Sequence, residues 1–317
     1  MIKVVSIVGP TASGKTRLSV EIAKKLNGEI VSADSMQIYK GMTIATAAPT
    51  EDEKQGIKHH LMEFLSSDKN FSVADYVELA HKAIYNIHKA DKLPIVVGGT
   101  GLYVDSLLNN IKFTDNSSDI KVREKYTEML NEYGVSYLLD KLKEIDNISY
   151  NRLSKEINAK RIIRALEFYE VTGKTITEQN INSKQDSPYN VIKIGLTCRD
   201  RELLYNRINK RIDIMLESGL LEEAEKVLNS DLSETAKKAI GYKELIPYFS
   251  GEQSLEECIE TLKMNTRRYA KRQLTWFRRD EDINWLYIDE YDSFEDLLNT
   301  ALKIIITKGF YNGQTSF

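Results

Sequence analysis

Five short runs of β-branched and other apolar residues are spread along the chain, and each is typical of a buried parallel strand. They lie at residues 4–8, 29–32, 94–97, 191–196 and 285–289. Between these runs, apolar residues recur every three or four positions, most clearly over 71–88, which is the period of an amphipathic helix. The alternation of strand and helix predicts an α/β fold in which helices flank a parallel sheet.

The strand pattern is absent from the middle of the chain, where three stretches have helical periodicity instead. These stretches are 119–133, 135–143 and 160–171. Polar, linker-like segments at 115–118 and 183–188 bound the region. We therefore expect an all-helical insertion domain over 114–188, set into a core that consists of residues 1–113 and 189–317.

The first predicted strand runs directly into the segment Gly9-Pro10-Thr11-Ala12-Ser13-Gly14-Lys15-Thr16, which fits the pattern Gly-x-x-x-x-Gly-Lys-Ser/Thr. A strand, a glycine-rich loop and a helix in this order bind phosphate, because the loop N–H groups and the helix N-terminus attract an anion. Lys15 is expected to contact phosphate oxygens, and the Thr16 hydroxyl to contact Mg²⁺. An ordinary glycine-rich turn is the alternative, but the flanking strand and helix favour a P-loop NTPase-like core. The pattern indicates a pyrophosphate-like ligand without identifying ATP.

Two further predicted strands end in residues that are suited to a ligand, and the carboxyl ends of parallel strands share one crevice. Asp34 follows the second strand, so we expect it beside the phosphate loop, where a carboxylate can bind a metal or accept a proton. A helix N-cap is the alternative role for this residue. The segment 98–101 follows the third strand and reads Gly-Gly-Thr-Gly, which allows close backbone approach and offers the Thr100 hydroxyl. A plain tight turn is the alternative there.

Charge is nearly balanced overall, with 44 Lys and Arg against 47 Asp and Glu, so the net charge of −3 does not by itself indicate a nucleic-acid partner. The segment 263–280 departs from this balance. It carries seven cations and a single acid, Asp280, with Tyr269, Trp276 and Phe277 between them. Cations interleaved with aromatic rings are typical of a groove that follows a nucleic-acid backbone. A solvated helix whose aromatic residues belong to the core is the alternative.

The two cysteines, Cys198 and Cys258, lie far apart, which argues against a zinc site or a disulfide framework and fits a reducing compartment. No signal-peptide pattern precedes the first strand, and no apolar run approaches the roughly 18 residues that a membrane span needs. We therefore expect a cytoplasmic protein that has no membrane partner.

The phosphate loop is accompanied by five further segments along the chain. They are Asp34-Ser35-Met36-Gln37-x-Tyr39, Val97-Gly98-Gly99-Thr100-Gly101-Leu102-Tyr103, Arg161-x-x-Arg164-Ala165-Leu166-Glu167, Ile240-Gly241-Tyr242 and Lys271-Arg272-Gln273-x-Thr275-Trp276. Together, and in this order, the segments resemble the tRNA dimethylallyltransferases over nearly the whole chain. The resemblance implies transfer of a dimethylallyl group from dimethylallyl diphosphate to N6 of the adenosine immediately 3′ of the anticodon, with that base flipped into a channel.

The resemblance also implies roles for individual residues. Lys15, the loop N–H groups and Mg²⁺ would stabilise the departing diphosphate. Asp34 would accept a proton from the amine or orient the amine, Thr100 would contact the flipped base, and Arg207 would clamp the pyrophosphate. Contacts with the anticodon stem-loop are implied for Asp34, Ser35, Met36, Gln37, Thr100, Arg123, Ala159, Lys160, Arg161, Ile162, Ile163, Gly241, Tyr242, Lys243, Lys271, Arg272, Gln273, Trp276 and Arg278. The insertion would contact the anticodon arm, and the expected active form is a monomer.

The chain departs from the family pattern at two loops. The family usually has Gly-Thr-Ala-Lys-Pro where this chain reads Ala45-Thr46-Ala47-Ala48-Pro49, and His-Pro-Asn where it reads Lys155-Glu156-Ile157. These differences concern expected tRNA contacts near the loops and leave the phosphate loop and Asp34 unchanged.

Three other functions compete with tRNA prenylation. A small-molecule kinase would use the same loop with ATP, but it would have no use for the basic, aromatic segment 263–280. A GTPase-like RNA-binding module would need an Asn-Lys-x-Asp loop, which the sequence lacks. Prenylation of free adenine nucleotides shares the chemistry. The helical insertion and the cationic C-terminal third favour a macromolecular acceptor over a free nucleotide.

Overall fold

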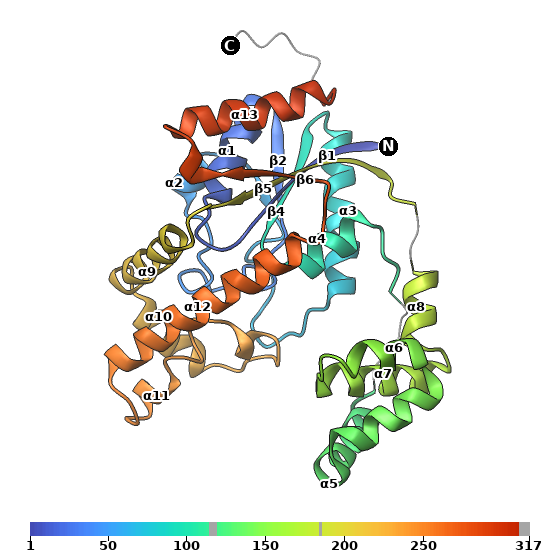
Figure 1. Cartoon of the computed structure of the whole chain (residues 1–317). Helices are drawn as coiled ribbons and strands as arrows, with labels where there is room; N and C mark the ends of the chain where they lie inside the picture. The colour runs from blue at the N-terminus through green and yellow to red at the C-terminus, as the bar shows by residue number, and fades with distance from the viewer. Residues whose placement is uncertain (114–118, 184–185, 311–317) are drawn as a thin grey trace. The chain divides into compact units, whose positions relative to one another are not determined.

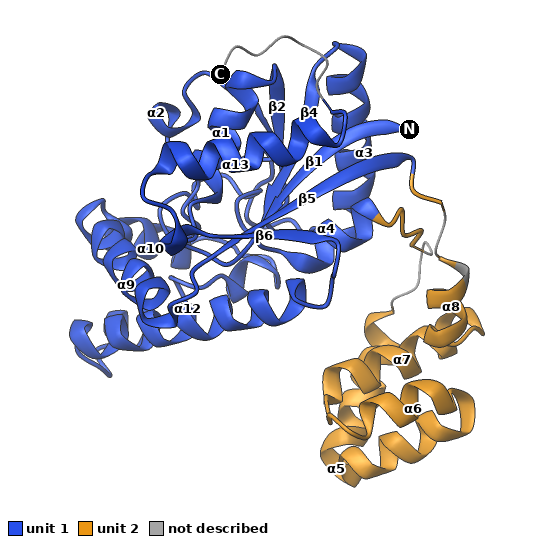
Figure 2. Ribbon diagram, turned by 45° about the horizontal axis from the view of Figure 1, so that its top comes forward, with its two compact units in different colours: residues 1–108, 188–317 blue, residues 109–187 orange. Residues whose placement is uncertain are grey.

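The computed structural model divides the chain into two compact units. The residues that it describes are 1–113, 119–183 and 186–310. The core unit comprises residues 1–108 and 188–317, and the insertion unit comprises residues 109–187 (Figure 2). The expected boundary at residue 114 and the linker 115–118 lie outside the described residues, as do positions 184 and 185 of the second linker. The insertion unit is therefore continuous in sequence, whereas two separate segments build the core unit.

The core unit is organised around a six-stranded parallel sheet (Figure 1). Its strands are β1 (Ile2–Val8), β2 (Gly28–Ser32), β3 (His59–His60), β4 (Leu93–Gly98), β5 (Tyr189–Thr197) and β6 (Ile283–Tyr287). Their order is β3-β2-β4-β1-β5-β6, and all neighbours run parallel. The five strands that the hydrophobic pattern predicts are confirmed, with slightly different ends. The edge strand β3 is not predicted, because two adjacent histidines carry no apolar strand pattern.

Some helices in the core unit begin at a side-chain cap that the local sequence supplies. The helices are α1 (Lys15–Lys25), α2 (Glu51–Lys54), α3 (Val73–Lys89), α4 (Gly101–Leu108), α9 (Arg201–Glu217), α10 (Leu220–Leu228), α11 (Ile246–Phe249), α12 (Leu255–Phe277) and α13 (Phe294–Thr307). Ser72 with Asp75 starts α3, and Ser254 with Glu257 starts α12, each through reciprocal capping-box hydrogen bonds. The basic segment 263–280 thus lies mostly on α12, and its last three residues follow the helix.

Both faces of the sheet are buried. Val5 and Ile7 of β1 belong to a hydrophobic cluster that includes residues of α1 and α13, and both helices lie over the same part of the sheet in Figure 1. Val4 and Val8 alternate with them along β1 and are also almost completely buried. A sheet that is covered on both faces explains why its strands have continuous apolar runs rather than an alternating pattern.

The strand order places the phosphate loop at a point where the chain reverses direction across the sheet. The connection from β1 leads past β4 to β2, whereas the connection from β4 leads past β1 to β5. In open parallel sheets, ligands bind outside the carboxyl ends of strands at such a reversal. The phosphate loop follows β1, and the segment 98–101 spans the end of β4 and the start of α4, so both lie at this position.

The described part of the insertion unit consists of helices and their connections. The helices are α5 (Ile120–Ile145), α6 (Asn147–Leu153), α7 (Ala159–Thr172) and α8 (Ile176–Asn182). Leu142 of α5 and Ile162 of α7 lie in its own hydrophobic core. Gly134, with φ of 78°, interrupts α5 between the two helices that the sequence predicts there. The short helices α6 and α8 are not predicted, because they depend on the side-chain caps Asp146 and Thr175 rather than on an apolar stripe.

The cysteines and the hydropathy of the helices can be compared with the sequence-based expectations. Cys198 and Cys258 are both buried and free. Across the described residues, no helix combines the length and the apolar character needed to cross a membrane.

Candidate active site

A cavity of about 300 Å³ lies in the core unit, where segments that follow several strands meet. Thr11, Lys15 and Thr16 of the phosphate loop line it, together with residues 34–37, which follow β2. The rest of the lining comes from the end of β4, from α9, from the start of α10, from α12, and from the loop residues 45–47, 238–241 and 243. The fold therefore brings the phosphate loop and Asp34 into one cavity, as the strand pattern predicts.

The backbone of the phosphate loop is shaped to hold an anion. Gly9 has φ of 146°, and a Cβ atom there would lie 2.2 Å from the carbonyl oxygen of Leu196, so only glycine fits. Ala12 and Gly14 lie in the left-handed region, with φ of 61° and 90°. Among the described residues, no side chain caps the N-terminus of α1, and the buried Ser13 hydroxyl has no hydrogen-bond partner. Unsatisfied donors at a helix N-terminus are the feature that binds phosphate in such loops.

Lys15 lines the cavity with only part of its charge compensated. Its Nζ donates a hydrogen bond to the carbonyl oxygen of Pro10 at 2.6 Å. The pKa of the ammonium group is lowered to about 7, mainly by burial and also by repulsion from Arg211, while the carboxylate of Asp34 opposes the shift. A bound phosphate would supply the missing negative charge and favour the charged form of Lys15.

Asp34 stabilises a local turn and also lines the cavity, although no helix begins at this position. Its Oδ1 accepts hydrogen bonds from the backbone N–H groups of Met36, at 2.9 Å, and Gln37, at 3.3 Å, so it stabilises the turn after β2. The same carboxyl group lines the cavity. Burial raises its pKa, and the two backbone hydrogen bonds and the charges of Lys15 and Arg211 act against this rise. A carboxylate with a raised pKa is a better proton acceptor than one in water.

Two arginines one turn apart on α9 reach the phosphate loop in different ways. Arg207, the expected pyrophosphate clamp, is exposed, and its Nε donates a hydrogen bond to the carbonyl oxygen of Ala12 at 2.8 Å. Arg211 lines the cavity itself, and its guanidinium donates to Thr11 Oγ1 at 3.4 Å and to the Ala47 carbonyl oxygen at 3.3 Å. The sequence places both arginines on one helical face, but it does not show which of them enters the cavity.

The segment 98–101 packs closely against the segment after β2. A Cβ atom on Gly98 would lie 2.1 Å from the carbonyl oxygen of Ala33, so glycine is required there. Thr100 Oγ1 accepts a hydrogen bond from the backbone N–H of Ser35 at 3.2 Å, next to Asp34. Thr100 therefore lies beside Asp34, and its expected contact with a flipped base stays a prediction.

Gln273 of α12 joins the two loops at the carboxyl ends of β1 and β4. Its Oε1 accepts a hydrogen bond from the Thr11 N–H at 2.9 Å, and its Nε2 donates to the Gly99 carbonyl oxygen at 3.0 Å. The side chain is buried, and both polar ends are used within the protein. Gln273, expected as a tRNA contact, is therefore a brace that holds the phosphate loop in place.

The basic segment on α12 divides into cations with internal partners and cations at the surface. Lys263 forms an ion pair with Asp213 at 2.8 Å, and Arg267 donates a hydrogen bond to the Asn209 side chain at 2.7 Å. The expected tRNA contacts Lys271, Arg272 and Arg278 are exposed, and Arg272 also borders the cavity.

The aromatic residues of this segment have separate environments. Tyr269 lines the cavity, whereas Phe277 is buried in the core unit. Trp276, expected at the tRNA, is half-buried, and its Nε1 donates a hydrogen bond to Asp105 Oδ2 at 2.7 Å. The three rings therefore do not form one continuous stacking surface.

The loop that contains Gly241, Tyr242 and Lys243 contributes to the cavity in part. Gly241 and Lys243 line it. Tyr242 is 2% exposed, and its hydroxyl donates a hydrogen bond to Glu223 at 2.8 Å. The side chain of Tyr242 therefore supports the loop from inside rather than presenting a surface to RNA.

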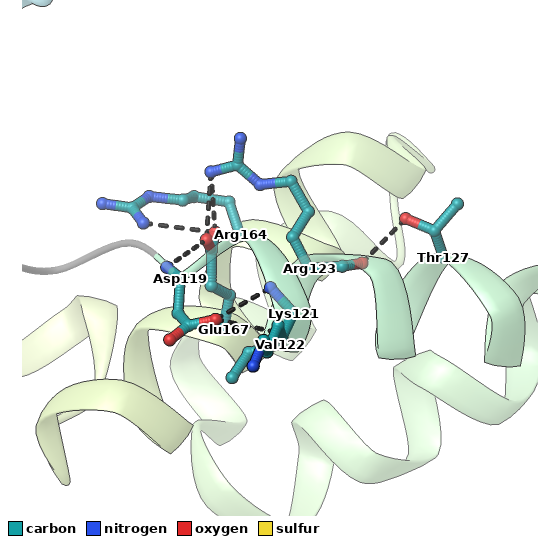
Figure 3. Close-up of polar contacts among 7 residues, drawn as sticks. All are labelled: Asp119, Lys121, Val122, Arg123, Thr127, Arg164 and Glu167. Atoms are coloured by element: carbon teal, nitrogen blue, oxygen red, sulfur yellow. Dashed lines mark hydrogen bonds and ion pairs between the residues drawn. The ribbon is translucent and has the colours of Figure 1, made fainter.

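In the insertion unit, a buried acid organises the arginines of two helices (Figure 3). Glu167 of α7 is fully buried and forms ion pairs with Arg123 of α5 at 3.0 Å and with Arg164 at 3.2 Å. It also accepts a hydrogen bond from the backbone N–H of Asp119 at 3.1 Å. Arg123, an expected tRNA contact, keeps about half of its side chain exposed.

The segment 159–163, expected to contact tRNA, has two faces. Lys160 and Arg161 are exposed, and Ala159 is partly buried. Ile162 and Ile163 lie in the hydrophobic core of the insertion unit. The two isoleucine side chains therefore support the fold of the unit, and only the cationic residues offer an RNA a surface.

Comparison with known proteins decides the family. A family model described as IPP transferase matches residues 37–280. The chain belongs to this family. The tRNA dimethylallyltransferase of Acetivibrio thermocellus is 50% identical over 314 residues, which cover 98% of this chain and 100% of that protein. The corresponding protein of Thermoanaerobacter sp. is 47% identical over 311 residues, which cover 97% of this chain and 98% of that protein.

Solved structures of the same enzyme share the fold. The full-length tRNA isopentenylpyrophosphate transferase of Bacillus halodurans has a TM-score of 0.73 and 43% identity, with 97% of each chain covered. A eukaryotic dimethylallyltransferase acting on tRNA has a TM-score of 0.81 and 29% identity, covering 99% of this chain and 81% of that chain. The family resemblance and the P-loop-like α/β fold expected from the sequence are confirmed.

The donors in this IPP transferase cavity fit a Mg²⁺ ion that is bound together with a diphosphate. Among the described residues, no group of three or more His, Cys, Asp or Glu side chains is arranged to hold a metal ion. Mg²⁺ in phosphoryl sites is commonly held by a few protein oxygens and by the phosphates themselves. The Thr16 hydroxyl, which lines the cavity, is an oxygen donor of this kind.

Proposed function

We propose that this chain transfers a dimethylallyl group from dimethylallyl diphosphate to N6 of the adenosine immediately 3′ of the anticodon in tRNA, with release of diphosphate. The observation that carries the proposal is the joining of an anion-binding loop and a buried carboxylate in one cavity. Family membership supports it, since the relatives are tRNA dimethylallyltransferases and a eukaryotic member is described as acting on tRNA.

The reaction exchanges one bond for another at the allylic carbon. The C–O bond to diphosphate breaks, a C–N bond to N6 forms, and the amine loses a proton. Lys15, the N–H groups at the start of α1 and Arg211 stabilise the negative charge that develops on the diphosphate. When bound, Mg²⁺ would add positive charge to the same oxygens, and Thr16 is the residue suited to hold it.

Asp34 accepts the proton that N6 loses. Its raised pKa, caused by burial, brings its basicity closer to the task than that of an exposed carboxylate. The Met36 and Gln37 N–H groups hold Oδ1, which fixes the orientation of the carboxyl group. An adenosine reaches this cavity only after leaving its base stack, because N6 is otherwise covered by neighbouring bases.

The insertion unit, in this proposal, contacts the anticodon arm through exposed cations. Arg123, Lys160 and Arg161 are suited to phosphate contacts on this unit, and Lys271 and Arg272 on the core unit. We further propose that the enzyme acts as a monomer in the cytoplasm, where its two free cysteines remain reduced.

Incubation of the pure protein with labelled dimethylallyl diphosphate tests the proposal. Two reactions contain a prenyl acceptor, unmodified tRNA or AMP. A third contains ATP as phosphate donor with a small-molecule acceptor. Label in tRNA that nuclease digestion places at the adenosine 3′ of the anticodon is the expected result. Label in AMP alone would support the prenylation of free nucleotides instead, and phosphate transfer from ATP would support a kinase.

A further inference from the structure

Glu223, on α10, accepts hydrogen bonds from five donors although it does not line the cavity. Three of them are the consecutive backbone N–H groups of Thr43, Ile44 and Ala45, at 2.8 to 3.1 Å. The other two are the Thr43 hydroxyl at 3.0 Å and the Tyr242 hydroxyl at 2.8 Å. Within the described residues, no lysine or arginine forms an ion pair with this carboxylate. Its charge is therefore compensated by the loop that it holds.

The two segments that Glu223 joins both form walls of the cavity. Ala45 and Gly241 belong to these walls. Gly241 has φ of 112°, and a Cβ atom there would lie 2.7 Å from the Cβ atom of Ala45. The segments 43–47 and 239–243 thus touch directly, and Glu223 fastens them from behind.

The far end of the segment 43–47 is tied to groups that surround Asp34. Gln37 Nε2 donates hydrogen bonds to the carbonyl oxygens of Thr46 at 3.1 Å and Ala47 at 3.2 Å. The backbone N–H of Gln37 in turn donates to Asp34 Oδ1. A displacement of the segment at Glu223 would therefore reach the turn that orients Asp34.

We infer that Glu223 is a positioning residue that fixes the acceptor side of the cavity. This side consists of the segments 43–47 and 239–243, as distinct from the phosphate loop. The inference rests on the proposed function, because it assigns the segments 43–47 and 239–243 to the adenosine and its neighbours. None of its five donors belongs to the phosphate loop or to α9. The segment 43–47 meets the diphosphate side at its far end, where Arg211 donates a hydrogen bond to the Ala47 carbonyl oxygen, so we expect a smaller effect on that side. The residue acts through these two segments and touches no substrate.

Glu223→Gln tests the inference with the least change in size. The amide can accept from some of the donors, but its NH₂ group faces N–H groups and it lacks the charge that strengthens these hydrogen bonds. We expect KM and Kd for tRNA to rise about tenfold, and the affinity for dimethylallyl diphosphate, measured by direct binding, to change less than twofold. Glu225→Gln is the matched control, since Glu225 is exposed on the same helix and its change removes the same charge.

Tyr242→Phe removes one donor to Glu223 and retains the ring. We expect a rise of about threefold in KM for tRNA, and a double variant with Glu223→Gln that is little worse than Glu223→Gln alone, because both changes break one interaction. If Glu223→Gln does not fold, as judged by thermal unfolding, Tyr242→Phe alone tests the inference. Its KM for tRNA should rise while its affinity for dimethylallyl diphosphate stays unchanged. Equal changes for both substrates, or no change for tRNA, would overturn the inference.

The activity of the wild-type protein distinguishes a failure of this inference from a failure of the proposed function. Absence of prenyl transfer to tRNA by the wild type would refute the function whatever the variants do. Transfer by the wild type, together with unchanged tRNA parameters in both variants, would refute only the positioning role of Glu223.

Discussion

The cavity of the core unit and the interior of the insertion unit each contain a carboxylate, but the charges of these two carboxylates are compensated differently. Asp34 Oδ1 accepts hydrogen bonds from two backbone N–H groups, and burial raises the pKa of this carboxyl group. Glu167 is fully buried and receives two guanidinium groups, from Arg123 and Arg164. Glu167 also accepts one backbone N–H, that of Asp119, but arginine side chains are hydrogen-bond partners of this acid alone.

The difference shows that burial alone does not identify a catalytic acid. Direct ion pairs with arginines occupy the carboxylate oxygens of Glu167, which commits this residue to holding α5 and α7 together. Asp34 lies near Lys15 and Arg211, but its hydrogen bonds come from backbone N–H groups. Its charge is therefore less stabilised, and a proton from the substrate can be accepted there. Matched substitutions at the two sites test this contrast.

The largest effect on the chemistry is expected from Lys15→Ala. Turnover should be abolished, because one preorganised contact to developing charge contributes roughly 10²–10³ in rate and Lys15 also holds the diphosphate before reaction. Affinity for tRNA, measured by filter binding, should be nearly unchanged. If the variant still transfers the prenyl group at close to the wild-type kcat, the phosphate loop is not part of the active site.

Asp34→Asn should slow the single-turnover rate by about 10²–10⁴ while the protein stays folded. The amide keeps the turn with Met36 and Gln37, but it cannot accept the amine proton. In the wild type, the rate should fall as the pH drops through the raised pKa of Asp34, because only the charged form is a base. A loss of less than about threefold would mean that Asp34 serves only the turn.

Glu167→Gln is the matched change in the insertion unit, and the opposite pattern is expected. The free energy of unfolding should fall by about 1.5–3 kcal/mol, since hydrogen bonds to a charged group are removed from a buried position. The single-turnover rate with saturating substrates should stay within twofold of the wild type. Hydrogen exchange of the intact chain should speed up over 120–170. A rate loss as large as that of Asp34→Asn would abolish the contrast between the two acids.

The smallest effect is expected from the double variant Lys271→Ala/Arg272→Ala at the surface of α12. If both cations bind phosphates, the affinity for all substrate tRNAs should fall alike, and the salt slope of log K should decrease by about one for each phosphate that is no longer neutralised. Binding across a salt series measures this slope, and the affinity for dimethylallyl diphosphate serves as the control. An unaltered slope would place the tRNA contacts on the insertion unit instead.

Local sequence was enough to predict the features that depend on neighbouring residues. The phosphate loop, the strand before it and the helix after it follow from spacing and periodicity within the first 26 residues. The place of Asp34 follows from parallel topology, because the ends of neighbouring strands meet. The missed edge strand β3 and the missed short helices lacked a periodic apolar pattern and depend on pairing and caps.

Features that depend on the packing of distant segments could not be predicted. Arg211 rather than Arg207 lines the cavity because of how α9 packs, which the spacing of the two arginines does not specify. Glu223 looks like an ordinary acid on a polar helix until the loop 43–47 meets it. Ile162 and Tyr242 lie in segments that match the family, but their own side chains are buried, and only packing separates them from exposed neighbours such as Arg161.

The brace formed by Gln273 has a consequence for the order of events during protein synthesis. Gln273 is 262 residues downstream of its partner Thr11, so the hydrogen bond between them cannot form while the chain is incomplete. At about 5–20 residues per second, the ribosome needs roughly 13–52 s to synthesise the intervening chain. The phosphate loop is therefore synthesised well before Gln273 and receives this support only after the entire insertion unit has been made.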